Sequence, residues 1–500
     1  MLKTESYKKG IIKSTALNVM VKCISFINTL VIAYYFGTSV DTDLYFYLFS
    51  FIILIAGLIN GMDVAVIIPE GMQIKETKGM DNAISFYNFF GYLYLLFGLL
   101  LFFVLLLFSS PIYNTISSFK NTVLAQHYSL LLLSSGLPLL IILSTYLTTV
   151  LTTIKYFTAP LIVNGITQFF ALIALLIFHK SIGIISVILG LTIGYIINII
   201  LLLFFMRIKL RWRFNFHSQK LSKRIIHNLV SVQLGNLASF AYNYGIIILL
   251  SSLITGVYSA YNYSMQIINI PIIFIVAQTA AVSGIKFNEL AAKDQYAQLN
   301  KIFYDSLGLL LFFIVPVCFL TWLYADLIVK ILFLRNKFSK EGAETTVLFI
   351  KYLIFLLPCL AINTFLTRLL MAIKKVNKSF YFQIGFNLSM LIIIFVNTSM
   401  FYLQGFIWST LIAYYLYSTV ACIFLMKWLM PYIKYIAFLK LFLRIVLINL
   451  PLCILAFFSI KYLFFIVPFL YIILLFFINR ITNVIPNLNL NIVKNYKSLA

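Results

Sequence analysis

Residues 207–224 read RIKLRWRFNFHSQKLSKR, and the rest of the chain is arranged around this stretch. It holds seven of the 37 lysines and arginines and no acidic residue. On each side lies a block of roughly 200 residues that consists mostly of long apolar runs. We interpret residues 207–226 as a basic hinge in the cytoplasm that joins two membrane-embedded halves.

The composition identifies an all-α polytopic membrane protein. Of the 500 residues, 63% are hydrophobic, and long, nearly uncharged runs recur along the whole length. Runs of about 18 residues or more are long enough to cross a bilayer as helices, and the short alternating segments of an outer-membrane barrel are not seen. The net charge of +24 lies in the short connections, so it favours membrane topology over a nucleic-acid partner.

We predict about fourteen transmembrane helices, arranged as two parallel six-helix lobes plus a C-terminal helix pair. The predicted parts are a first lobe at 1–206, the hinge at 207–226, a second lobe at 227–430, the helix pair at 431–481 and a tail at 482–500. With the N-terminus inside, the cytoplasmic connections and tails hold 26 lysines and arginines and the outer connections hold six. Both termini are therefore predicted to be cytoplasmic.

Similar short patterns recur in the two predicted lobes. Phe-Tyr-Asn at 86–88 recurs as Phe-Tyr-Asp at 303–305, an offset of 217, and Ile-Lys at 154–155 recurs at 373–374, an offset of 219. Because six helices make each copy, the two copies share one orientation. Parallel repeats of this kind are typical of transporters whose lobes rock around a central site.

Ionisable side chains inside a predicted span are costly and are therefore candidate functional groups. Lys22 lies about two turns into the first span. Asp63 lies near the inner end of the second span, and the two side chains could pair. One interpretation is a structural pair in which Lys22 snorkels to the interface. The other is that Lys22 binds an anionic head group and Asp63 releases it when the lobes tilt.

The seventh and eighth predicted spans, 227–253 and 256–285, carry an unusual number of amide side chains. These are Gln233, Asn236, Asn243, Asn262, Gln266, Asn269 and Gln278. Hydrogen bonds between helices explain part of this content. A hydrated cavity for sugar hydroxyls would also suit it, because amides both donate and accept hydrogen bonds.

The sequence does not indicate an enzyme. The four histidines lie at helix ends or in connections and the five cysteines lie far apart, so neither a metal site nor a cofactor is predicted. Asp41 and Asp43 are in the first outer connection, where polyprenyl-dependent membrane glycosyltransferases place acids. Asp43 also suits the first turn of a helix, where the macrodipole favours a negative charge. We favour that second interpretation.

Three stretches carry a family resemblance. Residues 36–46, FGTSVDTDLYF, resemble the junction between the first two helices of the MurJ/MviN-type lipid flippases. Asn60-Gly61 followed by Pro69 looks like that family's Glu-Gly and proline at the end of the second helix, and 261–271 is similar to its tyrosine-containing stretch before a proline. The family lies in the multidrug/oligosaccharidyl-lipid/polysaccharide exporter superfamily, which includes Wzx-type flippases.

The resemblance implies a flippase of the bacterial cytoplasmic membrane. It would move a polyprenyl-diphosphate-linked saccharide from the inner to the outer leaflet by alternating access, driven by a cation or the membrane potential. The terminal helix pair at 431–481 would border a groove for the lipid tail.

The family's substrate-binding arginines do not carry over. Lys22, Asn28, Ile55-Ala56 and Gln266 stand at their places. Because only arginine offers a planar bidentate fork to a diphosphate, a surface-polysaccharide repeat unit suits the residues better than lipid II. The predicted substrate-binding residues are Lys22, Asn28, Asp63, Gln233, Asn236, Asn243, Gln266 and Asn269.

Two alternatives stay open. The first is a multidrug or cation antiporter of the same superfamily, although Asp63 is nearly the only intramembrane acid available for ion coupling. The second is a polyprenyl-phosphate glycosyltransferase that uses Asp41 or Asp43.

Overall fold

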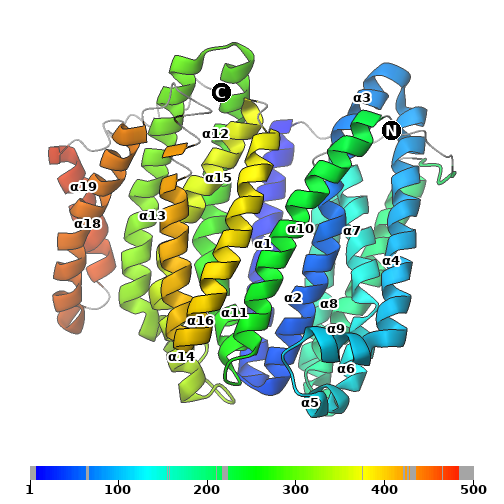
Figure 1. The fold of residues 1–500 in the computed structure, drawn as a ribbon, viewed down its shortest axis with the longest axis horizontal. Coiled ribbons are helices and arrows are strands. Elements are labelled where there is room, and N and C mark those ends of the chain that lie inside the picture. Colours follow the sequence, from blue (N-terminus) through cyan, green and yellow to red (C-terminus); the bar gives the residue numbers. More distant parts are fainter. Residues whose placement is uncertain are drawn as a thin grey trace. The chain divides into compact units, whose positions relative to one another are not determined.

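The computed structural model describes residues 7–63, 67–154, 156, 158–209, 211–216, 223–373, 376–420, 423–424, 427, 435–463 and 466–482. Within these residues every regular element is a helix, so the predicted all-α class is confirmed (Figure 1). The contacts divide the chain into two compact units. The first consists of Met1–Tyr263, Leu332–Ala343 and Phe380–Phe395, and the second consists of Ser264–Ile331, Glu344–Ser379 and Val396–Ala500.

The first unit begins with the long helices α1 (Tyr7–Phe36) and α2 (Val40–Met62). The helices that follow are α3 (Ile68–Lys78), α4 (Met80–Ile116), α5 (Asn121–Gln126), α6 (Tyr128–Ser134), α7 (Leu137–Thr153), α8 (Thr158–Ile182), α9 (Ile185–Phe204) with a π-helical turn at Phe205–Lys209, α10 (Lys223–Ser251) and the start of α11 (Val257–Pro271). The short helix α3 lies at one end of this unit and α5 and α6 lie at the other, with α4 running between them (Figure 1).

The second unit contains the rest of α11 and the helices that follow it. They are a π-helical turn at Ile272–Val276, α12 (Ala277–Ala292), nearly all of α13 (Tyr296–Leu332), most of α14 (Lys340–Leu353), a 3-10 turn at Ile354–Leu356, α15 (Leu357–Ala372), most of α16 (Val376–Val420), α18 (Tyr435–Leu463) and α19 (Val467–Thr482). The Tyr471 hydroxyl donates to Asn449 Oδ1 at 2.8 Å, which ties α19 to α18.

In the described part of the chain, twelve helical stretches are long and apolar enough to cross a membrane, and Val467–Asn479 is a shorter apolar helix. The predicted count of fourteen is therefore not confirmed. The main difference is α16, which covers the two predicted spans 378–399 and 401–426. Its backbone turns at Tyr402, where φ is 51° and ψ is −135°, so the chain reverses without a separate connection.

The predicted lobes at 1–206 and 227–430 stay predictions. Residue 210 and residues 217–222 of the predicted hinge lie outside the described residues, as does most of the predicted tail.

Two glycines allow α8 and α9 to pack closely. Gly190 and Gly194 are one turn apart on α9, and both are buried. A Cβ atom at Gly194 would lie 2.8 Å from the Cα of Thr167, and one at Gly190 would lie 2.7 Å from the Cα of Ala171. Small residues spaced in this way let helix backbones approach, which supplies the packing that association in a membrane depends on. The α8–α9 pair is therefore held by backbone proximity.

We expect Gly194→Ala to lower the melting temperature of the purified chain in detergent, at a cost of about 1–3 kcal/mol, because backbone atoms of α8 cannot yield to the new methyl group. Gly57→Ala is the matched control. Gly57 is also helical, but a Cβ atom added there would meet no other atom within 4 Å. Equal melting temperatures for the two variants would contradict the close-packing argument.

Candidate functional site

The Asp43 side chain caps the N-terminus of α11, although the two are more than 200 residues apart in the sequence. Its Oδ2 accepts a hydrogen bond from the Gly256 backbone N–H at 2.6 Å, and its Oδ1 accepts one from the Ser259 N–H at 2.7 Å. The side chain is buried, at 5% exposed. These amides are free at a helix N-terminus, where a carboxylate both satisfies them and complements the macrodipole. The predicted helix-terminal role is thus met by the N-terminus of α11 as well as by the first turn of α2.

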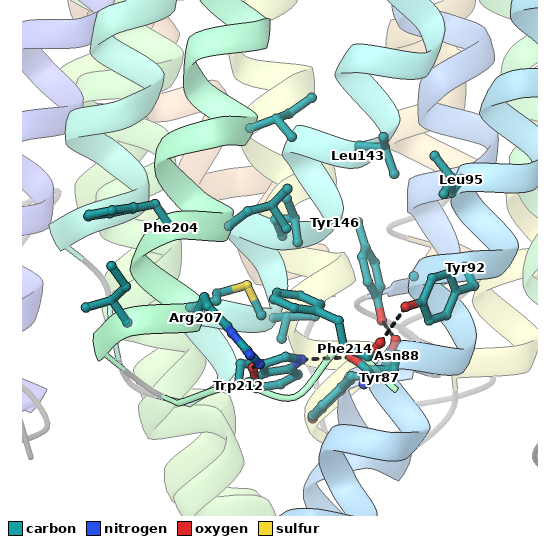
Figure 2. A pocket seen from close by; sticks show the side chains of 17 residues that line it. Tyr87, Asn88, Tyr92, Leu95, Leu143, Tyr146, Phe204, Arg207, Trp212 and Phe214 are labelled. Atoms are coloured by element: carbon teal, nitrogen blue, oxygen red, sulfur yellow. Dashed lines mark hydrogen bonds between the residues drawn. The ribbon is translucent and has the colours of Figure 1, made fainter. Parts of the chain in front are cut away.

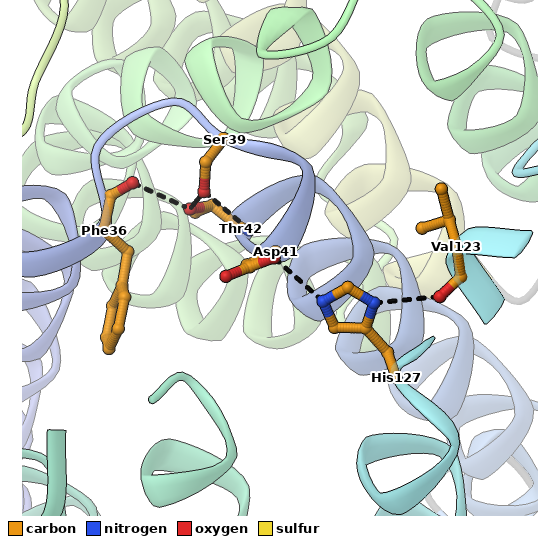
Figure 3. A network of polar contacts seen from close by, with 6 residues as sticks. All are labelled: Phe36, Ser39, Asp41, Thr42, Val123 and His127. Carbon is orange, nitrogen blue, oxygen red and sulfur yellow. Dashed lines mark hydrogen bonds and ion pairs between the residues drawn. The ribbon is translucent and has the colours of Figure 1, made fainter. Parts of the chain in front are cut away.

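Asp41 makes a different contact at the same end of the first unit. Its Oδ1 lies 2.8 Å from His127 Nε2, and His127 Nδ1 lies 2.9 Å from the carbonyl oxygen of Val123 (Figure 3). Ser39 and Thr42 share a hydrogen bond beside it, at 2.9 Å. The Asp41 side chain is half exposed. Both acids of this connection therefore have protein partners that fix helix ends.

Asp63 is a second buried acid of the first unit, but its partner is not Lys22. The Tyr94 hydroxyl of α4 donates to Asp63 Oδ1 at 2.7 Å, while Oδ2 has no hydrogen-bond partner among the described residues. Lys22 is exposed on α1. The possible Lys22–Asp63 pair is therefore not formed in this structure. The sequence placed both residues at a similar depth, but depth does not say which way a side chain points from its helix.

Asn28 connects two helices. Its Nδ2 donates to the carbonyl oxygen of Gln168 at 2.9 Å and to the Gln168 side chain at 3.3 Å, so α1 is tied to α8. The Asn28 Oδ1 atom is buried without a partner among the described residues. A substrate contact for Asn28 stays a prediction, as it does for Lys22 and Asp63.

The amides of α10 fall into two groups. Gln233 Oε1 and Asn236 Nδ2 are buried and have no hydrogen-bond partner in the described part of the chain. Asn236 packs against Gly61 of α2, since a Cβ atom there would overlap its amide. Asn243 is exposed and donates to the carbonyl oxygen of Ser239 on its own helix at 2.7 Å. Gln233 and Asn236 therefore retain unused hydrogen-bonding capacity, which suits water or a polar ligand.

Gln266 and Asn269 lie in the part of α11 that belongs to the second unit. Both side chains are partly exposed. Their role in substrate binding stays a prediction.

The family model described as "MurJ: Lipid II flippase MurJ" matches residues 32–477. This chain belongs to the MurJ family. A protein of Borreliella burgdorferi named "Probable lipid II flippase MurJ" is 22% identical over 375 residues, which are 73% of each chain. As a member of this family with its long apolar helices, the chain is a multi-pass membrane protein.

Solved structures share the MurJ fold with this chain. A structure of lipid II flippase MurJ in an inward closed conformation is similar with a TM-score of 0.78 at 19% identity, covering 94% of this chain and 98% of the other. An inward-facing multidrug resistance MATE transporter of the MOP superfamily is similar with a TM-score of 0.67 at 13% identity, covering 86% of this chain and 99% of the other. At these identities the likeness shows the fold.

Sequence reasoning missed a polar junction in this MurJ-family chain. Asn198 of α9 is fully buried and accepts a hydrogen bond from the Ser144 hydroxyl of α7 at 3.1 Å. Its Nδ2 donates to Asn164 at 3.0 Å and to Thr167 at 3.2 Å, both on α8. A lone asparagine in the apolar run 185–206 was the available signal. It joins three helices of the first unit.

No group of three or more His, Cys, Asp or Glu side chains among the described residues is arranged to hold a metal ion.

We expect Asp43→Ala to destabilise the chain by about 1–3 kcal/mol, because the substitution leaves two buried N–H groups of α11 without an acceptor. Asp41→Ala removes a half-exposed contact and should cost about 0–1 kcal/mol. Thermal unfolding of both variants in one detergent checks the ranking. An Asp41→Ala variant that is the less stable of the two would refute the capping role.

Proposed function

We propose that this chain is a flippase that moves a polyprenyl-diphosphate-linked saccharide from the inner to the outer leaflet by alternating access. The observation that carries the proposal is the family match, which runs from residue 32 to residue 477 and so includes both units and the terminal helices. The family consists of transporters, so the chain is not assigned a catalytic activity. The fold likeness to inward closed MurJ agrees with a protein that alternates between states.

The residues favour a surface-polysaccharide repeat unit over lipid II as the saccharide. By the resemblance, Lys22, Asn28 and Gln266 stand where the family has substrate-binding arginines. A lysine meets a diphosphate as a point charge, whereas an arginine holds two oxygens at once. The unpartnered amide atoms of Gln233 and Asn236 can bond sugar hydroxyls directly or through water.

A membrane glycosyltransferase is less well supported. Asp43 is buried with both carboxylate oxygens bonded to the start of α11, and Asp41 is bonded to His127. Neither acid is positioned as a free general base.

A multidrug or cation antiporter is the other alternative, since MATE transporters share the fold. The family match favours the lipid-linked substrate.

The bacterial cytoplasmic membrane is the proposed location, with both termini in the cytoplasm because the basic residues concentrate in the corresponding connections. A cation or the membrane potential drives the cycle.

We propose that α18 and α19 border the groove for the polyprenyl tail. Exposed apolar side chains are frequent on both helices, among them Leu447, Phe458 and Phe477, which suits contact with hydrocarbon.

Two complementation strains would identify the saccharide. One bacterial strain is depleted of its essential lipid II flippase, the other lacks its surface-polysaccharide flippase, and each expresses this chain. We expect rescue of polysaccharide export. Rescue of the first strain alone would show that the absent arginines are replaceable and that the substrate is lipid II. Rescue of neither, with the chain correctly inserted, would refute the flippase assignment.

Lys22 is the proposed contact for the anionic head group. We expect Lys22→Ala to abolish export and Lys22→Arg to retain it, because the charge rather than the exact side chain meets the diphosphate. Lys180→Ala serves as the control, since Lys180 is an exposed lysine at the far end of α8. Export is measured at matched membrane levels of each variant. Normal export by Lys22→Ala would remove Lys22 from the substrate site.

A further inference from the structure

A cavity of about 560 Å³ lies within the first unit, and none of the residues predicted to bind substrate lines it. Its wall comes from α4, α7, the end of α9 with its π-helical turn, and the segment 211–216 that starts the basic stretch (Figure 2). Leucines, valine, isoleucines and aromatic rings form nearly all of this wall. The polar side chains that line it are Tyr87, Asn88, Tyr92, Tyr146, Arg207 and Trp212.

Residues 211–216 are fastened over the cavity. Asn88 of α4 uses its whole amide: Oδ1 accepts from Trp212 Nε1 at 2.7 Å, and Nδ2 donates to the carbonyl oxygens of Arg213 at 2.5 Å and Asn215 at 3.1 Å. The Tyr92 hydroxyl donates to the carbonyl oxygen of Phe214 at 2.6 Å. We call residues 211–216 the strap.

Two aromatic side chains of the strap line the cavity, and its two arginines are exposed. Trp212 is 1% exposed and, with Phe214, faces the cavity, whereas Arg211 and Arg213 are exposed. Among the described residues no carboxylate forms a salt bridge with Arg211 or Arg213. The strap thus exposes both basic side chains and an apolar one, Phe216 at 62%, and this combination is suited to the boundary between hydrocarbon and anionic head groups.

The cavity opens where apolar side chains are exposed. Phe204 and Ile208 both line it and are 59% and 54% exposed. Arg207 stands between them on the chain, lines the same cavity, and donates from Nη1 to the carbonyl oxygen of Trp212 at 3.3 Å. The opening therefore has exposed apolar side chains that can contact an acyl chain, and beside them in sequence an arginine whose guanidinium group is held by a hydrogen bond.

We infer that this cavity binds an anionic phospholipid of the cytoplasmic leaflet, with an acyl chain among the α4, α7 and α9 side chains and the phosphate at Arg207. Basic pockets between transmembrane helices on the cytoplasmic side are suited to anionic head groups. The volume falls within the range of small-molecule binding pockets, about 300–1,000 Å³, so the cavity has room for part of a lipid. Because the strap covers the cavity, a bound lipid would also stabilise the start of the basic stretch on the first unit.

The test uses the purified full chain, with phosphatidylglycerol or phosphatidylcholine added in detergent. Native mass spectrometry measures bound lipid, and thermal unfolding measures stabilisation. We expect phosphatidylglycerol to be retained and to raise the melting temperature more than phosphatidylcholine does. Equal retention and equal shifts for the two lipids would overturn the proposal.

Two variants locate the site, each with a matched control. Leu203→Trp fills the cavity, whereas Leu201 is on the same helix with nearly the same exposure, 37% against 36%, and does not line it. Arg207→Gln removes the cation, and Lys180→Gln removes an exposed charge elsewhere. We expect the phosphatidylglycerol-specific shift to be lost in Leu203→Trp and Arg207→Gln and kept in both controls. A shift that is kept in Leu203→Trp, or lost equally in Leu201→Trp, would refute the assigned location.

Undecaprenyl phosphate provides the final arm, because a carrier lipid presents the same phosphate and hydrocarbon chemistry. Retention of undecaprenyl phosphate in place of phosphatidylglycerol, abolished by Leu203→Trp, would mean that the cavity holds the carrier and would overturn the phospholipid assignment. Competition in favour of phosphatidylglycerol would support it. If Leu203→Trp fails to fold, Arg207→Gln with its control decides the outcome.

Discussion

A polar group within the membrane-spanning part of this chain must find its hydrogen-bond partner inside the protein, because hydrocarbon supplies none. The first unit meets this requirement with a few side chains that each bond several groups. Asn198 joins α7, α8 and α9 through one amide, and Asn28 joins α1 to α8. Asp43 satisfies two N–H groups at the start of α11. The order of helices in space is thus specified by polar contacts that are rare in an apolar sequence.

The same requirement explains how the connections of the first unit are held. At one end, the Tyr263 hydroxyl donates to the carbonyl oxygen of Gly37 at 2.9 Å, next to the Asp43 contacts. At the other end, Asn88 and Tyr92 bond the carbonyl groups of the strap. Connections are normally the most mobile parts of a protein. Here side chains from the long helices bind the backbone of the connections, so each end of the unit is part of the packed structure.

The sequence predicted the helices, which depend on local pattern, but it did not predict contacts that depend on which way a side chain points from its helix. Apolar runs predicted the long helices because length and hydropathy decide whether a segment can span a bilayer. Similar depth in the membrane made a Lys22–Asp63 pair possible, but Tyr94 of α4 bonds Asp63, and only the packing of the helices could show that. The turn at Tyr402 lies close to the predicted boundary between the spans 378–399 and 401–426, because two successive apolar runs are together too long for one crossing, although no glycine or proline marks the residue that turns.

The seam between α2 and α10 has a consequence for how easily this part of the protein can take up water. Gln233 and Asn236 each keep a buried amide atom without a partner among the described residues, and Asn236 lies against Gly61. A buried unpaired polar atom costs about 1–3 kcal/mol, and hydration returns that energy. The entry of water is therefore favoured at this contact, because water would bond the amide atoms that have no partner among the described residues. A water molecule that reached Asn236 beside Gly61 would supply the acceptor that its amide lacks among the described residues, so α2 and α10 are joined less tightly there than the glycine-packed pair α8 and α9.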